Sequence, residues 1–211
     1  MEKNKRRGLL LVISSPSGVG KTSIVRQLLK LNPDLVTSTS VTTRAPRPGE
    51  IDGQDYYFVD HAAFQHSLLK GEFLEHAKVY GNYYGTPRQF VLDKIEAGID
   101  IVFDIDWQGT QQLAQTSSSD LVSIFVLPPS VQELATRLRN RGLDAQEVVE
   151  NRLAQTSSEL SHWAEYDYVL INEDLEHTVK QVQNILYSER LKRIRQPQLV
   201  YFVQQLCNTM L

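Results

Sequence analysis

The residue types best suited to chemistry gather in one short segment, Ser15-Pro16-Ser17-Gly18-Val19-Gly20-Lys21-Thr22. An apolar run at 9–13 precedes it, and a segment with helical spacing at 24–29 follows it. The glycines leave room for a phosphate beside the backbone, whose N–H groups point at the anion where the helix begins. Lys21 can supply a positive charge to the β- and γ-phosphates of a nucleoside triphosphate, and Thr22 can supply a hydroxyl to Mg²⁺. The segment therefore predicts a nucleotide phosphate site, although Ser15 replaces the first glycine of the full pattern.

A pair of carboxylates forms a second candidate. Asp104 and Asp106 lie two residues apart at the end of an apolar run at 99–105, so on a strand both would face one side of the sheet. Ligands of open α/β sheets bind beyond the carboxyl ends of the strands. We therefore expect Asp104 to act on Mg²⁺, directly or through a water, as the acidic partner of Thr22. A single aspartate here would fit an ordinary strand-ending turn equally well.

These residues need a scaffold, and the chain supplies apolar runs that alternate with helical patterns. Strands are expected at 8–14, 99–105, 121–127 and 168–171. Helices are expected at 21–31, 60–71, 86–98 and 174–195. Buried strands joined by helices imply an α/β fold, a parallel sheet flanked by helices on both faces.

Two segments depart from this rhythm. The segment 40–85 has short apolar stretches with polar alternation and looks like an inserted substrate-binding module, with a turn expected at 81–85. Thr86 is expected to cap the helix that follows, with Pro87 at its first position. The segment 130–155 is basic and is interrupted by a glycine, which indicates a mobile basic flap.

Composition narrows the function classes. The 211 residues suffice for one domain with a substantial core, and a net charge of −3 gives no indication of a nucleic-acid or anionic-membrane partner. Cys207 is the only cysteine, so an intrachain disulfide is impossible and a cytoplasmic, reducing compartment is expected. The first apolar run ends at Ser14, short of a signal core, and no run approaches the ~20 residues that span a membrane. The five histidines lack metal-ligand spacing.

Six motifs together resemble the guanylate kinase family. In chain order they are the phosphate-binding loop and the segments 40–50, 73–75, 81–86, 104–109 and 137–142. The resemblance covers about 9–189. It implies a P-loop NTPase fold and reversible transfer of the ATP γ-phosphate to GMP, giving ADP and GDP, with Mg²⁺, in nucleotide recycling and GTP supply. It also implies three domains: a core at 1–39, 87–129 and 156–211, a GMP-binding mixed α/β domain at 40–86, and a helical lid at 130–155.

The resemblance implies that four residues hold the phosphate of GMP: Arg44, Arg47, Tyr56 and Tyr84. The two arginines lie on a loop bounded by prolines, and guanidinium forks suit a dianionic phosphate. The tyrosines can add hydroxyl donors. Two loop arginines considered alone would more often form a solvated surface.

Guanine recognition is assigned to a second group. Glu75 can accept two adjacent hydrogen bonds, which guanine offers through N1–H and its 2-amino group and adenine does not. Ser40 and Thr86 can donate hydroxyls to guanine O6, and the resemblance places Asp106 on the GMP side. Buried polar groups of this kind reject a base that leaves them unpaired. The alternation of the strand alone leaves Glu75 equally able to face solvent.

The flap carries further candidates for catalysis. Arg137, Arg141 and Arg152, with Lys21 and Arg44, would neutralise charge in the transition state when the flap closes, where phosphoryl transfer depends on positioning and electrostatics. Open, the flap arginines would be a solvated basic surface. The resemblance alone places Asn172 near the adenine of ATP.

Two other functions compete with this hypothesis. A guanylate kinase-like module that binds protein partners without catalysis would have lost residues of the ATP site, which are present here. A P-loop kinase for another small acceptor is the second alternative, against which Glu75, Ser40 and Thr86 argue together. The apolar tail at 197–211 could pack on the core or join a second copy in a homo-oligomer. The expected small-molecule partners are ATP and GMP or dGMP.

Overall fold

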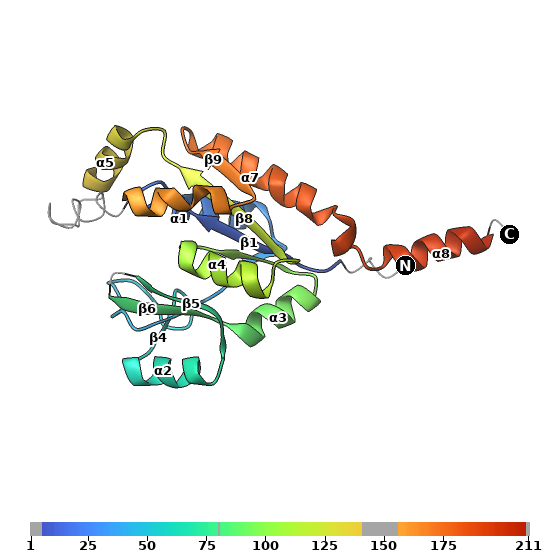
Figure 1. The fold of residues 1–211 in the computed structure, drawn as a ribbon, viewed down its shortest axis with the longest axis horizontal. Helices are drawn as coiled ribbons and strands as arrows, with labels where there is room; N and C mark the ends of the chain where they lie inside the picture. Colours follow the sequence, from blue (N-terminus) through green and yellow to red (C-terminus); the bar gives the residue numbers. More distant parts are fainter. Residues whose placement is uncertain (1–5, 80, 141–155, 210–211) are drawn as a thin grey trace.

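The structure is a computed structural model that describes residues 6–79, 81–140 and 156–209 (Figure 1). Its centre is a five-stranded sheet in the order β2-β7-β1-β8-β9, and every neighbouring pair is parallel. The strands are β1 (Leu10–Ser14), β2 (Leu35–Thr37), β7 (Asp100–Phe103), β8 (Leu121–Leu127) and β9 (Tyr168–Ile171). The predicted α/β fold with a parallel sheet is confirmed.

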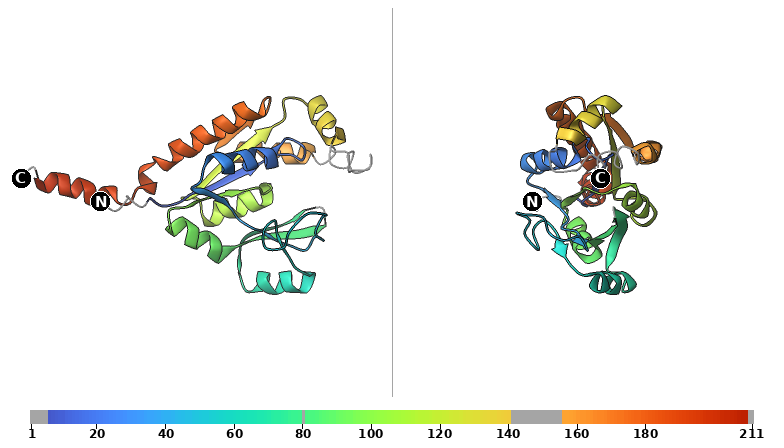
Figure 2. Two further views of the ribbon diagram at one scale, coloured as in Figure 1. Left: turned by 180° about the vertical axis from the view of Figure 1, so that it is seen from behind. Right: turned by 90° about the vertical axis from the view of Figure 1, so that its left-hand side faces the viewer.

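Helices cover both faces of this sheet (Figures 1 and 2). The side chains of Leu9, Leu11 and Ile13 pack with α1 (Lys21–Leu31) and α7 (Leu175–Arg190), whereas Leu10 and Val12 pack with α3 (Arg88–Glu96) and α4 (Trp107–Thr116). This alternation follows from the two-residue period of a strand buried on both faces. A further helix, α5 (Val131–Asn140), inserts Leu134 and Leu138 into the first of these cores.

A second sheet lies below the first in Figure 1, in the order β4-β3-β6-β5. It contains β3 (Val41–Thr42), β4 (Tyr57–Phe58), β5 (Phe73–Val79) and β6 (Asn82–Pro87), and it is antiparallel except between β3 and β4. The helix α2 (His61–Leu69) begins after Asp60, whose carboxylate accepts a hydrogen bond from the Ala63 N–H.

The expectation of a turn at 81–85 is wrong. Tyr83 and Tyr84 pair with Lys78 and Ala77 in the β5–β6 ladder, and only Gly81, at φ 83°, provides the turn. The aromatic side chains pack across the sheet and override the turn signal of the flanking glycines. The capping role of Thr86 is also wrong, because Thr86 belongs to β6 and Pro87 occupies the N-cap position without a side-chain hydrogen bond.

Other element bounds differ from those expected from the sequence. The strand β7 ends at Phe103, so Asp104 and Asp106 follow the strand instead of lying on it, and Asp106 caps α4. The helix α7 ends at Arg190 and a short 3-10 turn, Arg193–Arg195, follows it. Another 3-10 turn covers Ser161–Glu165.

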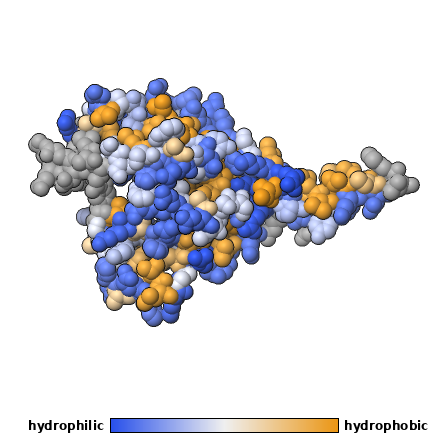
Figure 3. All heavy atoms as spheres, in the orientation of Figure 1, coloured by the Kyte–Doolittle hydropathy of each residue, from blue (hydrophilic) through white to orange (hydrophobic). Residues whose placement is uncertain are grey.

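The last helix, α8 (Leu199–Thr209), projects from the body of the molecule (Figure 2). None of its residues is buried, and apolar side chains gather on it (Figure 3). They include Val200, Tyr201, Phe202, Val203 and Leu206, with exposed fractions from 45% to 68%. The helix thus makes no contribution to the two cores described above.

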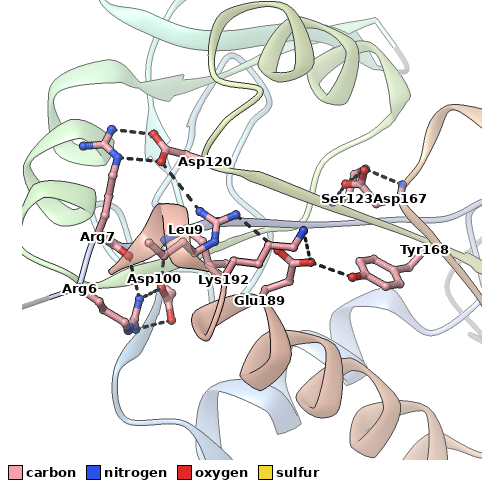
Figure 4. A network of polar contacts seen from close by, with 11 residues as sticks. Arg6, Arg7, Leu9, Asp100, Asp120, Ser123, Asp167, Tyr168, Glu189 and Lys192 are labelled. Carbon is pink, nitrogen blue, oxygen red and sulfur yellow. Dashed lines mark hydrogen bonds and ion pairs between the residues drawn. The ribbon is translucent and has the colours of Figure 1, made fainter. Parts of the chain in front are cut away.

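Charged residues hold together the amino ends of the sheet strands (Figure 4). Asp100 is fully buried and accepts hydrogen bonds from Arg6, from Nε of Arg190 at 2.7 Å and from the Leu9 N–H at 3.0 Å. Asp120 accepts two from Arg7, at 2.7 and 2.6 Å. These bonds tie the start of the described chain to α7 and to two strands.

Candidate active site

The carboxyl ends of the parallel strands meet at the opposite edge, where the topology brings the predicted phosphate site together. Two clefts lie there. One, of about 180 Å³, is lined by the loop after β1 together with Val79, Asp106 and Glu159. The other, of about 590 Å³, is lined by residues that include Ser40, Arg47, Tyr56 and Asp104. Thr22 lines both clefts, so the two adjoin at the start of α1.

Two glycines of the phosphate-binding loop have unusual backbone angles and close neighbours. Gly18 and Gly20 have φ values of 91° and 110°, which side chains rarely adopt. A Cβ atom at Gly18 would lie 2.8 Å from Leu138, and one at Gly20 would lie 2.8 Å from Nδ2 of Asn172. The glycines are therefore required by backbone angle and by packing.

Asn172 and Arg137 both contact the loop backbone at Val19. Nδ2 of Asn172 donates to the Val19 carbonyl at 2.7 Å, and Thr178 donates its hydroxyl to Oδ1 of Asn172 at 3.0 Å. Arg137 donates to the same Val19 carbonyl at 3.2 Å and to the Asn172 carbonyl at 3.3 Å. Nδ2 of Asn172 thus holds the loop while Thr178 of α7 fixes Oδ1, and the place of Asn172 near adenine stays a prediction. Arg141 and Arg152 lie outside the described residues.

Lys21 and Thr22 converge on Asp104. The Lys21 ammonium lies 3.0 Å from Oδ1 of Asp104, and the Thr22 hydroxyl donates to Oδ2 at 3.3 Å. Burial opposes the charge of Lys21, but the attraction and hydrogen bond of Asp104 outweigh burial and raise its pKa. Lys21 therefore stays protonated. A hydroxyl and a carboxylate this close form an oxygen donor set that suits Mg²⁺.

The guanidinium of Arg44, in the loop after β3, is paired with the carboxylate of Glu50. Arg44 donates to both carboxylate oxygens of Glu50, at 3.0 and 2.8 Å, and Glu50 also accepts the Arg47 N–H at 2.7 Å. The Arg44 guanidinium lies 5.3 Å from the centre of the Tyr56 ring, which meets Tyr84 edge-on. Glu50 raises the pKa of Arg44, mainly through the hydrogen bonds, and Arg44 lowers the pKa of Glu50. The structure thus brings together Arg44, Tyr56 and Tyr84.

Glu75 is buried, with an exposed fraction of 3%. Its Oε1 accepts the Thr86 hydroxyl at 2.5 Å, and burial raises its pKa to about 7, against the hydrogen bond from Thr86. A Cβ atom at Gly109 would lie 2.5 Å from its Oε2. The carboxylate therefore occupies a space on α4 that only glycine leaves open. Asp106 accepts the N–H groups of Gln108 and Gly109 as the cap of the same helix.

Sequence reasoning missed three participants. Glu159 carries no local signal, because its partner Ser17 lies 142 positions away. Glu50 lies within six positions of Arg44 and Arg47, but spacing in an irregular loop does not predict which side chains pair. Gly109 did carry one: a glycine in the first turn of a helix costs stability and usually marks a close approach. In the part of the chain that the structure describes, no three His, Cys, Asp or Glu residues cluster to hold a metal, and no helix is long and apolar enough to cross a membrane.

A strand, a phosphate-binding loop and a following helix at the carboxyl edge of a parallel sheet define a P-loop nucleotide-binding protein, and the second sheet beside the loop is typical of a nucleotide kinase. The family model for guanylate kinase matches residues 7–189. The chain belongs to the guanylate kinase family.

Curated and solved relatives agree with this assignment. The chain is 58% identical to the guanylate kinase of Paramagnetospirillum magneticum, over 95% of the chain and 94% of that protein. It is 54% identical to that of Cereibacter sphaeroides, over 95% and 96%. The crystal structure of guanylate kinase from Anaplasma phagocytophilum matches with a TM-score of 0.80 at 40% identity, over 95% of this chain and 96% of that one. The structural match therefore covers nearly the whole chain, including both sheets.

Proposed function

We propose that the chain transfers the γ-phosphate of ATP to GMP, giving ADP and GDP, and that the two adjoining clefts hold the two nucleotides. The observation that supports this arrangement is the position of Thr22, which lines both clefts at the start of α1. A donor phosphate on the loop and an acceptor phosphate near Arg47 and Tyr56 would then face each other there. Phosphoryl transfer needs this in-line placement more than any covalent assistance.

The donor side is the loop. Its backbone N–H groups and the Lys21 ammonium bind the phosphates of ATP, and this set comprises Ser15, Pro16, Ser17, Gly18, Val19, Gly20, Lys21 and Thr22. Asn172 and Arg137 hold the loop backbone in place from the far side. A divalent cation, Mg²⁺ held by Thr22 and Asp104, supplies charge neutralisation on the phosphates when it is bound.

The acceptor side lies on the second sheet. Arg44, Arg47, Tyr56 and Tyr84 bind the phosphate of GMP or dGMP. This phosphate replaces Glu50 as the partner of the Arg44 guanidinium. The attacking oxygen belongs to this phosphate and is already anionic, so no strong general base is needed.

The guanine base is read by buried polar groups. The ionised Glu75 accepts N1–H and the 2-amino group, and Thr86 and Ser40 donate to O6. Asp106 supports this pocket as the cap of α4, which packs against β5. Adenine would leave the carboxylate of Glu75 without donors, and an unpaired buried charge disfavours binding strongly.

The domain division follows from these roles. The core comprises 1–39, 87–129 and 156–211, the GMP-binding domain 40–86 and the lid 130–155. In this scheme the lid brings Arg141 and Arg152 over the phosphates and excludes water, and Arg137 supports the loop backbone at Val19.

The test is ADP formation from ATP and Mg²⁺ with GMP, dGMP, AMP, UMP and CMP offered separately. Turnover confined to the guanine nucleotides is expected. Turnover with another acceptor would overturn the guanine assignment but keep the kinase. Binding of GMP without any turnover would instead indicate an interaction module.

A further inference from the structure

A carboxylate from a distant part of the chain lies in the phosphate-binding loop. Glu159, in the helical segment 156–160, lines the cleft of about 180 Å³ together with the loop. Its Oε2 accepts the backbone N–H of Ser17 at 3.3 Å, across 142 positions of sequence. This N–H belongs to the loop whose amides bind phosphate oxygens in the proposed function.

The surroundings of Glu159 are those of an anion site. Lys21 attracts its carboxylate and Asp106 repels it, and both line the same cleft. Burial raises the pKa of Glu159, against the hydrogen bond from Ser17 and the attraction of Lys21. The raised pKa means that burial disfavours the charged form of Glu159 more than its neighbours favour it, although the Ser17 N–H and Lys21 both attract an oxygen anion at this position.

The contact contributes little to the fold. It is a single, long hydrogen bond, Ser17 and Glu159 are both partly exposed, and neither residue belongs to the two apolar cores. A long hydrogen bond between partly exposed groups stabilises a protein only weakly. The effect of Glu159 on phosphate binding is larger than its effect on folding stability, because the carboxylate and the phosphate carry the same charge and compete for the same amide.

We propose that Glu159 is an internal competitor of the nucleotide phosphates, which accepts the Ser17 N–H and must withdraw from it when ATP binds. This inference rests on the proposed function, since it takes the loop as the ATP phosphate site. The competitor is tethered, so it acts at a constant effective concentration. It weakens nucleotide binding and assists the departure of ADP after transfer, a step that often limits nucleotide kinases.

The experiment compares ADP and pyrophosphate binding by calorimetry, without GMP, in the wild-type protein, Glu159→Gln and Glu159→Ala. Both variants should bind roughly fivefold tighter, because one negative charge a few ångströms from the phosphates is removed. The gain should shrink as the salt concentration rises from about 0.05 M to about 0.5 M, since screening weakens the repulsion. Stopped-flow release of ADP should slow by a similar factor.

Glu165→Gln is the matched control. It removes the same charge six positions later, where the carboxylate contacts Gln111 and His162 and not the loop. Its ADP affinity should equal that of the wild type.

Three results would overturn the proposal. Unchanged or weaker ADP binding in both Glu159 variants would show that the carboxylate does not compete. Tighter binding in Glu159→Gln alone would show that the new amide donates to the phosphate. If the wild-type protein bound neither ADP nor pyrophosphate, the proposed function itself would fail along with this inference.

Discussion

The two edges of the parallel sheet carry charge in different ways. At the amino edge, Asp100 and Asp120 are buried and bonded to Arg6 and Arg7 respectively (Figure 4). At the carboxyl edge, Lys21 pairs with Asp104 and Arg44 pairs with Glu50 beside open clefts. The same residue types therefore form permanent partnerships at one edge and replaceable ones at the other.

The difference lies in whether the partner of a charged group can be exchanged for a ligand. Lys21, Arg44 and the Ser17 N–H each have an internal carboxylate as partner, respectively Asp104, Glu50 and Glu159. Each carboxylate can be replaced by a phosphate without leaving a bare charge. At the amino edge no such exchange exists, because burial makes the loss of one partner expensive. Substitutions at the carboxyl edge are therefore expected to lower activity, and substitutions at the amino edge are expected to lower stability.

The largest expected effect is at the carboxyl edge. Lys21→Met should lower phosphoryl transfer by at least roughly 10³-fold, because it removes a charge from the transition state. The melting temperature should stay within a few degrees of the wild type, since Lys21 is only partly buried. Lys30→Met, an exposed position on the same helix, is the control. Full activity in the Lys21 variant would end the proposed function.

The opposite pattern is expected at the amino edge. Asp100→Asn should lower the free energy of unfolding by about 3–5 kcal/mol, because Arg6 and Arg190 would lose a buried partner. The KM values for ATP and GMP should not change. Urea denaturation measures the first and steady-state kinetics the second, with the exposed Asp34→Asn as control. A change confined to KM would break the distinction between the edges.

Glu75 lies between these extremes, since it is buried yet proposed to bind substrate. Its folded-state pKa of about 7 exceeds the ordinary 4.5, so the folded state keeps a proton that the unfolded state loses between these values. Stability should therefore fall as the pH rises through this window, by about 3 kcal/mol in all. Glu75→Gln should remove that loss and be more stable than the wild type at pH 8, with a smaller difference at pH 5.

Binding of GMP should strengthen as the pH rises, whereas stability falls. GMP affinity of the wild type should rise from pH 6 to pH 8 as Glu75 ionises, and Glu75→Gln should weaken GMP use far more than ATP use. The exposed Glu72→Gln serves as control for both measurements. Equal losses for the two nucleotides would count against base recognition by Glu75.

The smallest expected effect concerns Gly109. Gly109→Ala should raise the KM for GMP roughly tenfold, because the new methyl group would meet Oε2 of Glu75 and displace it. The KM for ATP should not change. Alanine favours a helix by about 1 kcal/mol over glycine, so a folding defect is not the expected cause. Gly98→Ala would be a poor comparison, since Gly98 has a φ of 79°; thermal melting of Gly109→Ala itself gives the check.

Local sequence determined much of the fold and of the loop. The strands β8 and β9 and the helix α1 have the predicted bounds, because apolar runs and helical spacing act within one segment. The phosphate loop could be predicted for the same reason, as its glycines, Lys21 and Thr22 are contiguous. The strand β6 could not, because Tyr83 and Tyr84 become a strand only through pairing with β5.

The sequence by itself determined the class of chemistry, since a phosphate loop, paired aspartates and clustered arginines need only their residue types and spacing. Only the tertiary structure decided which groups meet. Glu75 faces Gly109, Glu159 reaches Ser17, and Thr86 donates to a carboxylate instead of capping a helix. The physical reason is that hydrogen bonds and burial depend on distance in space, and these partners are brought together by sheet topology and not by neighbouring positions in the chain.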